Sequence, residues 1–309
     1  MKFREERGIG HCGLACVLCS DENCIGCKAN GANGEGCSVS KSAMEKKLDG
    51  CYACADYSSC EEGMLQGKRN KAFNRYAQEF GEPALIERLR VNYENGITYH
   101  TPDKSPGDYD VLETEDEIYQ LLRYGRNDPY AKCPGFETKH FKFRQVQEKD
   151  AEDLLSFYGD LGNWMFYGND MCKSIFASRY ATVEEMKHCI RVWLDEYRNK
   201  YYIRFSVVDK TTEKAIGTIE LFDNIGKRNP IETVRLSAVL HIDFSVPYET
   251  QEYISELLSL ANAEFFKIFG VKHLLIRAVP TAKERIMALL SAGYEPFEWE
   301  TGREHYYIK

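Results

Sequence analysis

Long apolar runs are missing from this sequence, and so is an excess of positive charge. No stretch approaches the roughly 20 apolar residues that a helix needs to cross a bilayer, and residues 1–7 lack the apolar core of a secretion signal. We therefore expect a cytoplasmic protein without a membrane partner. The 40 Lys and Arg face 48 Asp and Glu, which gives a net charge of −8. Because broad nucleic-acid binding requires a basic face, we do not expect a nucleic-acid partner.

Cysteine, in contrast, is abundant and unevenly distributed. The 309 residues contain 12 cysteines, and nine of them fall between Cys12 and Cys60. Cys133, Cys172 and Cys189 stand apart among apolar neighbours, which is typical of small buried hydrophobic residues. The cysteines thus distinguish a Cys-rich head, residues 12–60, from a conventional remainder in a chain that is 43% hydrophobic and 28% charged.

The chain is long enough for two domains, and a loop signal separates them. Residues 125–136 contain two prolines and two glycines, a composition typical of a linker. We expect a Cys-rich metal-binding domain with a helical extension over residues 1–125, a linker over 126–137, and a second domain over 138–309.

Capping residues and hydrophobic periodicity predict where the helices and strands lie. Thr114 with Glu117, and Thr182 with Glu185, have the spacing of a capping box at a helix start. Helical spacing of apolar residues predicts further helices over 72–80, 85–93, 151–158, 254–268 and 282–292. Runs rich in β-branched and aromatic residues predict strands over 141–143, 201–208, 215–222, 234–244, 273–279 and 303–308. From residue 138 the order is β-α-α-β-β-β-α-β-α-β, which predicts the α+β class with a mixed sheet flanked by helices.

The spacing of the head cysteines predicts a metal site. Three Cys-x2-Cys units occur, and each can fold as a knuckle that presents two thiolates to one ion. The candidate ligands are Cys12, Cys16, Cys19, Cys24, Cys27, Cys37, Cys51, Cys54 and Cys60. Eight thiolates suit two tetrahedral zinc ions, with one cysteine or His11 left over, so we expect one to two zinc ions.

Two other uses of these cysteines stay open at this point. An iron–sulfur cluster is one, since Cys12-x3-Cys16-x2-Cys19 has the spacing found in radical SAM enzymes, although the next residues read as loops rather than a barrel. Disulfides are the other, but nine cysteines leave one unpaired and a cytoplasmic location disfavours the bond.

The head also resembles the DUF3795 family of small Cys-rich proteins. The matching motifs are residues 12–19 (CGLACVLC), residues 24–27 (CIGC), and Cys37 through residues 51–54 (CYAC) to Cys60. The resemblance covers residues 10–100, and Ser42 stands where that family often has another cysteine. It implies metal binding and no established activity.

Three segments of the second domain resemble the GCN5-related N-acetyltransferase (GNAT) family. They are residues 214–221 (KAIGTIEL), residues 240–247 (LHIDFSVP) before the long helix, and residues 292–294 (AGY) after the last helix. With the element order, the resemblance covers residues 138–309. It implies a fold in which acetyl-CoA is the co-substrate and an amine is the acceptor.

The resemblance also implies where acetyl-CoA binds. The strand before the long helix offers unpaired backbone to the pantetheine arm, and the helix N-terminus receives the pyrophosphate. The positions concerned are Phe244, Ser245, Val246, Thr250 and Gln251. The family's glycines are missing there, and Glu249 and Glu252 bring two carboxylates where an anion should dock.

Two carboxylates are candidate general bases. Asp243 and Glu220 lie on adjacent predicted strands, and a carboxylate can take the proton of an acceptor amine. A solvated strand residue is the structural alternative for each. The positions that match the family's base and its thiol-protonating tyrosine hold Leu240 and Leu289.

Two functions follow from these observations. The first is an acyl-CoA-dependent N-acetyltransferase with a zinc-binding N-terminal domain, acting on a small-molecule or protein amine. The alternative is a non-catalytic zinc-binding interaction or regulatory protein with a degenerate GNAT fold, whose Cys-rich head contacts a protein partner.

Overall fold

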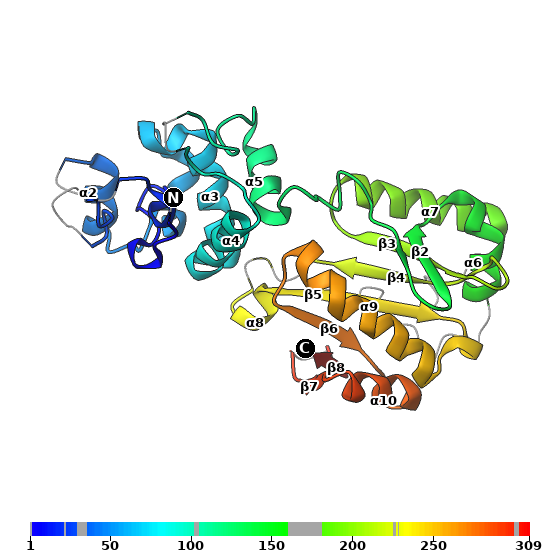
Figure 1. Ribbon diagram of the computed structural model, residues 1–309. Coiled ribbons are helices and arrows are strands. Elements are labelled where there is room, and N and C mark those ends of the chain that lie inside the picture. The colour runs from blue at the N-terminus through cyan, green and yellow to red at the C-terminus, as the bar shows by residue number, and fades with distance from the viewer. Residues whose placement is uncertain are drawn as a thin grey trace. The chain divides into compact units, whose positions relative to one another are not determined.

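The computed structural model describes residues 2–21, 23–29, 36–101, 105–159, 181–224, 227, 229–299 and 303–309 (Figure 1). Cys172 lies outside these residues. The chain forms two compact units, Met1–Asp128 and Pro129–Lys309. Within the described residues, none of the helices combines the length and the apolar character that a membrane span requires.

The first unit is built from helices. Its elements are η1 (Glu5–Arg7), η2 (Cys16–Leu18), α2 (Ser38–Glu45), η3 (Cys51–Ala53), η4 (Tyr57–Ser59), η5 (Gly63–Gln66), α3 (Lys68–Phe80), α4 (Glu82–Glu94) and α5 (Glu115–Tyr124). Helices α3 and α4 cover the stretches predicted over 72–80 and 85–93. At the start of α5 the Thr114 hydroxyl accepts a hydrogen bond from the Glu117 N–H at 3.1 Å, and the Glu117 carboxylate accepts one from the Thr114 N–H at 2.9 Å. The predicted capping box is confirmed.

The second unit is an eight-stranded mixed sheet with helices on both faces. Its strands are β1 (Phe136–Glu137), β2 (Phe141–Gln145), β3 (Ile203–Asp209), β4 (Ala215–Phe222), β5 (Ser237–Phe244), β6 (His273–Arg277), β7 (Glu295–Phe297) and β8 (Tyr306–Ile308). They lie in the order β1-β2-β3-β4-β5-β6-β8-β7, and all neighbours are antiparallel except β5 and β6. The α+β class predicted for this part of the chain is confirmed.

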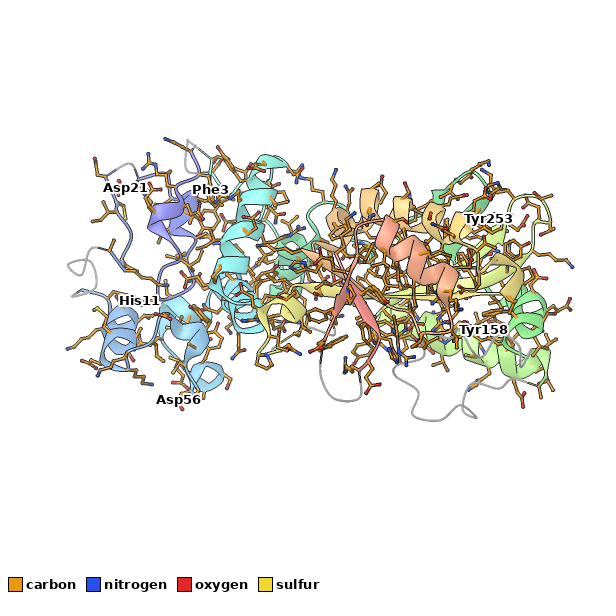
Figure 2. The ribbon with its side chains drawn as sticks, turned by 90° about the horizontal axis from the view of Figure 1, so that it is seen from below. Phe3, His11, Asp21, Asp56, Tyr158 and Tyr253 are labelled. Atoms are coloured by element: carbon orange, nitrogen blue, oxygen red, sulfur yellow. The ribbon has the colours of Figure 1, made fainter. Side chains whose placement is uncertain are left out.

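The helices of this unit form two layers. They are η6 (Glu148–Asp150), α6 (Ala151–Tyr158), α7 (Val183–Arg198), α8 (Glu232–Arg235), η9 (Val246–Tyr248), α9 (Gln251–Phe269) and α10 (Lys283–Ser291). Helices α6 and α7 share one hydrophobic cluster, in which Leu154 and Trp193 pack near Ala215 of β4. Helix α9 covers the other face, where the Phe265 ring lies 5.6 Å from that of Phe136. Figure 2 accordingly shows Tyr158 of α6 and Tyr253 of α9 on opposite sides of the sheet.

Some predicted boundaries are wrong for identifiable reasons. Val234 and Arg235 belong to helix α8 and Leu236 is its C-cap, so residues 234–236 are not part of a strand. The Arg235 N–H donates to the Ile231 oxygen at 3.0 Å. The last strand begins at Tyr306 instead of 303, because His305 has φ +67°. Strand β7 was not predicted, and its Pro296 is tolerated because β7 is an edge strand.

The pairing of β5 changes along its length. The parallel ladder between β5 and β6 joins only Ser237, Ala238 and Val239 to residues 273–275. The antiparallel ladder on the other side of β5 continues to Phe244. In the described chain, residues 240–244 therefore have no strand paired to their β6-side edge.

Gly217 lets β4 and β5 approach each other at the end of this ladder. Its φ is +157°, and a Cβ atom there would lie 2.0 Å from the Asp243 oxygen. Contacts that short do not occur, so any side chain at this position must push β5 away. Gly217 therefore fixes the position of Asp243.

We predict that Gly217→Ala destabilises the second unit by about 1–3 kcal/mol, because the added methyl group overpacks a buried strand contact. Urea unfolding followed by tryptophan fluorescence measures the change, since all three tryptophans lie in residues 129–309. Gly135→Ala is the matched control, because its nearest atom, the Phe143 oxygen, is 3.6 Å away. Equal stability of the two variants would contradict this role of Gly217.

Candidate functional site

A buried polar cluster lies between the sheet and helices α6 and α7. Strand alternation places Arg204 of β3 opposite Glu220 of β4, and Glu220 opposite His241 of β5. One pleat further on, Thr218 lies opposite Asp243. These polar side chains share one face of the sheet, while the residues between them supply the apolar face under α9.

Arg204 is the centre of this cluster. Its guanidinium pairs directly with the Glu220 carboxylate and lies 3.9 Å from an oxygen of Asp243. It also donates to the Thr218 hydroxyl at 2.9 Å, and it stacks on the Trp193 ring at 3.9 Å from the centroid. Burial lowers the pKa of Arg204, but the neighbouring acidic groups, chiefly Tyr158, Tyr202 and Asp243, outweigh that effect and raise it. The Arg204 guanidinium thus interacts with two carboxylates and is covered by the Trp193 ring.

Tyr158, the last residue of α6, links the helix layer to Asp243. Its hydroxyl donates to Asp243 Oδ2 at 3.0 Å, and it lies 2.8 Å from the Thr218 hydroxyl and 3.1 Å from Arg204 Nη1. Burial raises the pKa of Tyr158 well above its ordinary value, and the charge of Asp243 adds to this effect. The phenol therefore stays protonated at neutral pH and can serve as a hydrogen-bond donor.

The two carboxylates differ in their surroundings. The Glu220 side chain is 5% exposed, and its second oxygen lies 3.9 Å from His241 Nδ1. The Asp243 side chain is 15% exposed and lies further from Arg204. Asp243 is thus the carboxylate that is more accessible to an incoming group and less neutralised by the cation.

The structure brings the two predicted catalytic residues into one site. Glu220 and Asp243 lie on either side of Arg204, whereas Leu240 and Leu289 are fully buried core residues. Sequence reasoning missed Arg204 and Tyr158. Arg204 carried a usable signal, since it is a charged residue between the apolar Ile203 and Phe205.

The backbone predicted to bind acetyl-CoA leads from β5 into α9. Phe244 is buried, and the Ser245 N–H donates to the Ile216 oxygen at 3.1 Å. Val246 is 45% exposed and begins the short turn η9, which the sequence did not predict. Thr250 is the N-cap of α9 and accepts from the Tyr253 N–H at 3.4 Å, so Gln251 is the first helical residue. The binding roles of these five residues stay predictions.

The two carboxylates expected at this helix start separate in the structure. Glu249 precedes the N-cap and forms a buried ion pair with Arg285 of α10, the two side chains being 3% and 2% exposed. Burial raises the pKa of Glu249 despite the adjacent guanidinium. Glu252 points outward, with 69% of its side chain exposed and Lys139 3.8 Å away. Only Glu249 is therefore part of the interior.

The Cys-rich head places its cysteines in two neighbourhoods. Cys12, Cys37, Cys51 and Cys60 belong to one cluster with Val39 and Leu65. Cys51, Cys54 and Cys60 also line a cavity of about 50 Å³. In the other neighbourhood, Cys16 and Cys27 converge on Gly10, and Cys27 Sγ lies 3.7 Å from His11 Nδ1.

These thiols are not arranged as a metal centre. Burial, with the neighbouring thiols, raises the pKa of Cys16 and of Cys51 to about 11 in the metal-free chain. Throughout the described chain, no group of three or more His, Cys, Asp or Glu side chains is placed to hold a metal ion. The described cysteines form no disulfide either. The nine-cysteine zinc site is thus not confirmed, and the donor atoms would have to move closer to bind an ion.

Comparison with known proteins identifies the second unit. A family model described as "Acetyltransferase (GNAT) domain" matches residues 140–295. This region lies outside the head, so the resemblance of residues 10–100 to the DUF3795 family stays a prediction. A search of curated protein sequences finds no match.

Solved acetyltransferase structures resemble part of this chain. A putative ribosomal-protein-serine acetyltransferase from Vibrio cholerae is 16% identical over 57% of this chain and 95% of its own, with a TM-score of 0.41. The ribosomal-protein-S5-alanine acetyltransferase from Vibrio fischeri is 18% identical over 57% and 93%, with a TM-score of 0.43. A spermidine N-acetyltransferase from Vibrio cholerae is 15% identical over 55% and 92%, with a TM-score of 0.39.

We predict that Arg204→Met destabilises the second unit by about 3–5 kcal/mol, because it leaves the buried Glu220 and the partly buried Asp243 without their cation. Urea unfolding at neutral pH measures this loss. Lys142→Met is the matched control, since Lys142 pairs with Glu213 on the surface, where such pairs contribute little. A loss no larger than that of the control would contradict the central role of Arg204.

Proposed function

The chain belongs to the GNAT acetyltransferase family, and from this premise we propose that it transfers an acyl group from acyl-CoA to an amine. The observation that carries the proposal is the early end of the β5–β6 ladder. After Val239, the strand that bears Asp243 has an edge without a strand partner in the described chain. An extended ligand can bind such an edge through backbone hydrogen bonds, next to a carboxylate that can take up a proton.

Asp243 is the proposed general base. An amine is nucleophilic only after it loses the proton of its ammonium form, and a carboxylate within hydrogen-bond reach can accept that proton. Asp243 suits this role better than Glu220, because Glu220 is committed to its direct pair with Arg204. The Tyr158 hydroxyl, which donates to Asp243, orients the carboxylate.

Glu220 and Arg204 then act as positioning residues. Arg204 lowers the cost of keeping two carboxylates in one site, and its direct pair with Glu220 fixes the guanidinium next to Asp243. Transfer forms a C–N bond at the acyl carbon and breaks its C–S bond, and the CoA thiolate takes up a proton from water or from a neighbouring donor.

We predict that Asp243→Asn lowers kcat at least about 100-fold, because the amide cannot accept the proton. The assay is release of free CoA thiol from acetyl-CoA in the presence of spermidine, lysine or a peptide with a free N-terminal amine. Glu213→Gln is the control, since Glu213 lies in the exposed turn between β3 and β4. An active wild-type enzyme whose Asp243→Asn variant keeps more than half of its activity would exclude Asp243 as the base.

A non-catalytic binding role is the second candidate. The observation that favours it is the buried ion pair between Arg285 of α10 and Glu249, a residue that lies between the end of β5 and the start of α9. If no acceptor amine or acyl-CoA produces turnover, this unit serves as a binding module, and the head is the part that contacts a protein partner.

We also propose that the Cys-rich head binds zinc. Two of its Cys-x2-Cys units form short turns in which the second cysteine N–H donates to the first cysteine oxygen, at 3.1 Å for Cys16 and Cys19 and 3.0 Å for Cys51 and Cys54. Such knuckles bring two sulfur atoms to one side. Small movements within the cluster of Cys12, Cys37, Cys51 and Cys60 would complete a tetrahedral set.

Purified protein should therefore contain about one to two zinc ions per chain and be colourless. Elemental analysis measures the metal, and the double variant Cys51→Ser/Cys54→Ser should lose about one ion. Cys133→Ala, outside the head, is the control and should keep the full complement. A brown preparation that contains iron would show that the head holds an iron–sulfur cluster instead of zinc. A metal-free protein would refute metal binding.

A further inference from the structure

The first turn of α10 contacts the site that the proposed acyl donor would use. Glu284 and Arg285 are adjacent in the sequence, yet each bonds to a different part of the β5–α9 connection. Arg285 donates to the Ile242 oxygen at 2.9 Å and pairs with Glu249, while Glu284 accepts from the Gln251 N–H at 3.1 Å. Two neighbouring side chains thus occupy both ends of this connection.

The bond to Ile242 is made on the strand where the ladder has ended. The last β5 residue paired with β6 is Val239, and Ile242 lies three residues further. A main-chain oxygen at this place needs a donor, because a buried carbonyl without a hydrogen bond costs free energy. Arg285 supplies that donor, in the position that an N–H of an extended ligand would otherwise take.

The bond from Glu284 is made at the N-terminus of a long helix. The first N–H groups of α9 lack partners within the helix, and they favour an anion. The Glu284 carboxylate takes the Gln251 N–H, and the Thr250 hydroxyl takes the Tyr253 N–H. The charge of Glu284 thus stands where a phosphate of a ligand would be most strongly stabilised.

A buried ion pair such as the one that anchors this arrangement adds little net stability to a fold. Its two side chains are 3% and 2% exposed, and the desolvation of two such charges offsets most of their attraction. Apolar residues of similar volume would fill the same space at equal or lower cost. The pair instead fixes the start of α10 against the β5–α9 connection.

We propose that Glu284 and Arg285 close the acyl-donor site by occupying it, so that acyl-CoA binds only after the first turn of α10 gives up these contacts. The inference rests on the proposed function. Arg285 donates to β5 where an amide N–H of the ligand would donate, and the Glu284 carboxylate lies at the start of α9 where a phosphate of the ligand would bind. Because the site must first open, the wild-type protein binds acyl-CoA weakly, with a dissociation constant on the order of 1 mM.

Binding of acetyl-CoA and of free CoA, measured by calorimetry, tests this inference. Glu284→Ala removes an exposed carboxylate, and Glu249→Gln/Arg285→Ser opens the strand edge without leaving a buried charge unpaired. We expect each variant to bind acetyl-CoA at least tenfold more tightly than the wild type. Met287→Ala is the matched control on the exposed side of α10 and should leave binding unchanged.

The outcomes separate this inference from the proposed function. Micromolar binding by the wild type that neither variant improves overturns the inference alone. No binding by any of the proteins overturns both, because opening the site then reveals no donor site. If the double variant unfolds, as judged by its circular dichroism, Glu284→Ala decides the question, since its side chain is exposed.

Discussion

The early separation of β5 from β6 is the constraint on which the second unit depends. Three paired residues hold the two strands together, and beyond Val239 the sheet opens toward the start of α9. Three features of the site depend on this opening. Asp243 lies on the open part of the strand, Glu249 is placed where the strand turns into the helix, and α10 has access to Ile242 because β6 does not cover it.

Charge is distributed differently on the two sides of this opening. Under α6 and α7, one guanidinium serves two carboxylates, so the site carries a net negative charge that suits an ammonium group. At the α9 side, Arg285 balances Glu249, and Glu284 adds a further negative charge at the helix N-terminus. The first arrangement suits the cationic acceptor that we propose. In the second, side chains of the chain itself already occupy the hydrogen-bonding groups of the strand and the helix start.

Local signals explain which features the sequence predicts. Capping boxes at Thr114 and Thr182 involve residues three positions apart, so the sequence contains all the information, and both are present in the structure. Strand alternation on β4 and β5 likewise places Glu220 and Asp243 on one face of the sheet, as diagonal neighbours in the register. The strands β1 and β7 were missed, because two or three residues are too short for a period to appear.

Contacts between distant segments explain what the sequence does not predict. Arg204 and Tyr158 are 46 residues apart, and Glu249 and Arg285 are 36 apart, so no spacing rule connects them. The sequence of residues 249–254 shows that the glycines typical of the family are absent there, but it does not show which side chains contact this turn. The fold supplies that answer, since α10 comes after β6 and packs back against the start of α9. When the glycines of such a turn are missing, the helix that packs on the turn must therefore be considered as well. Here a side chain of α10 hydrogen-bonds to the start of α9, where a ligand phosphate could otherwise bind.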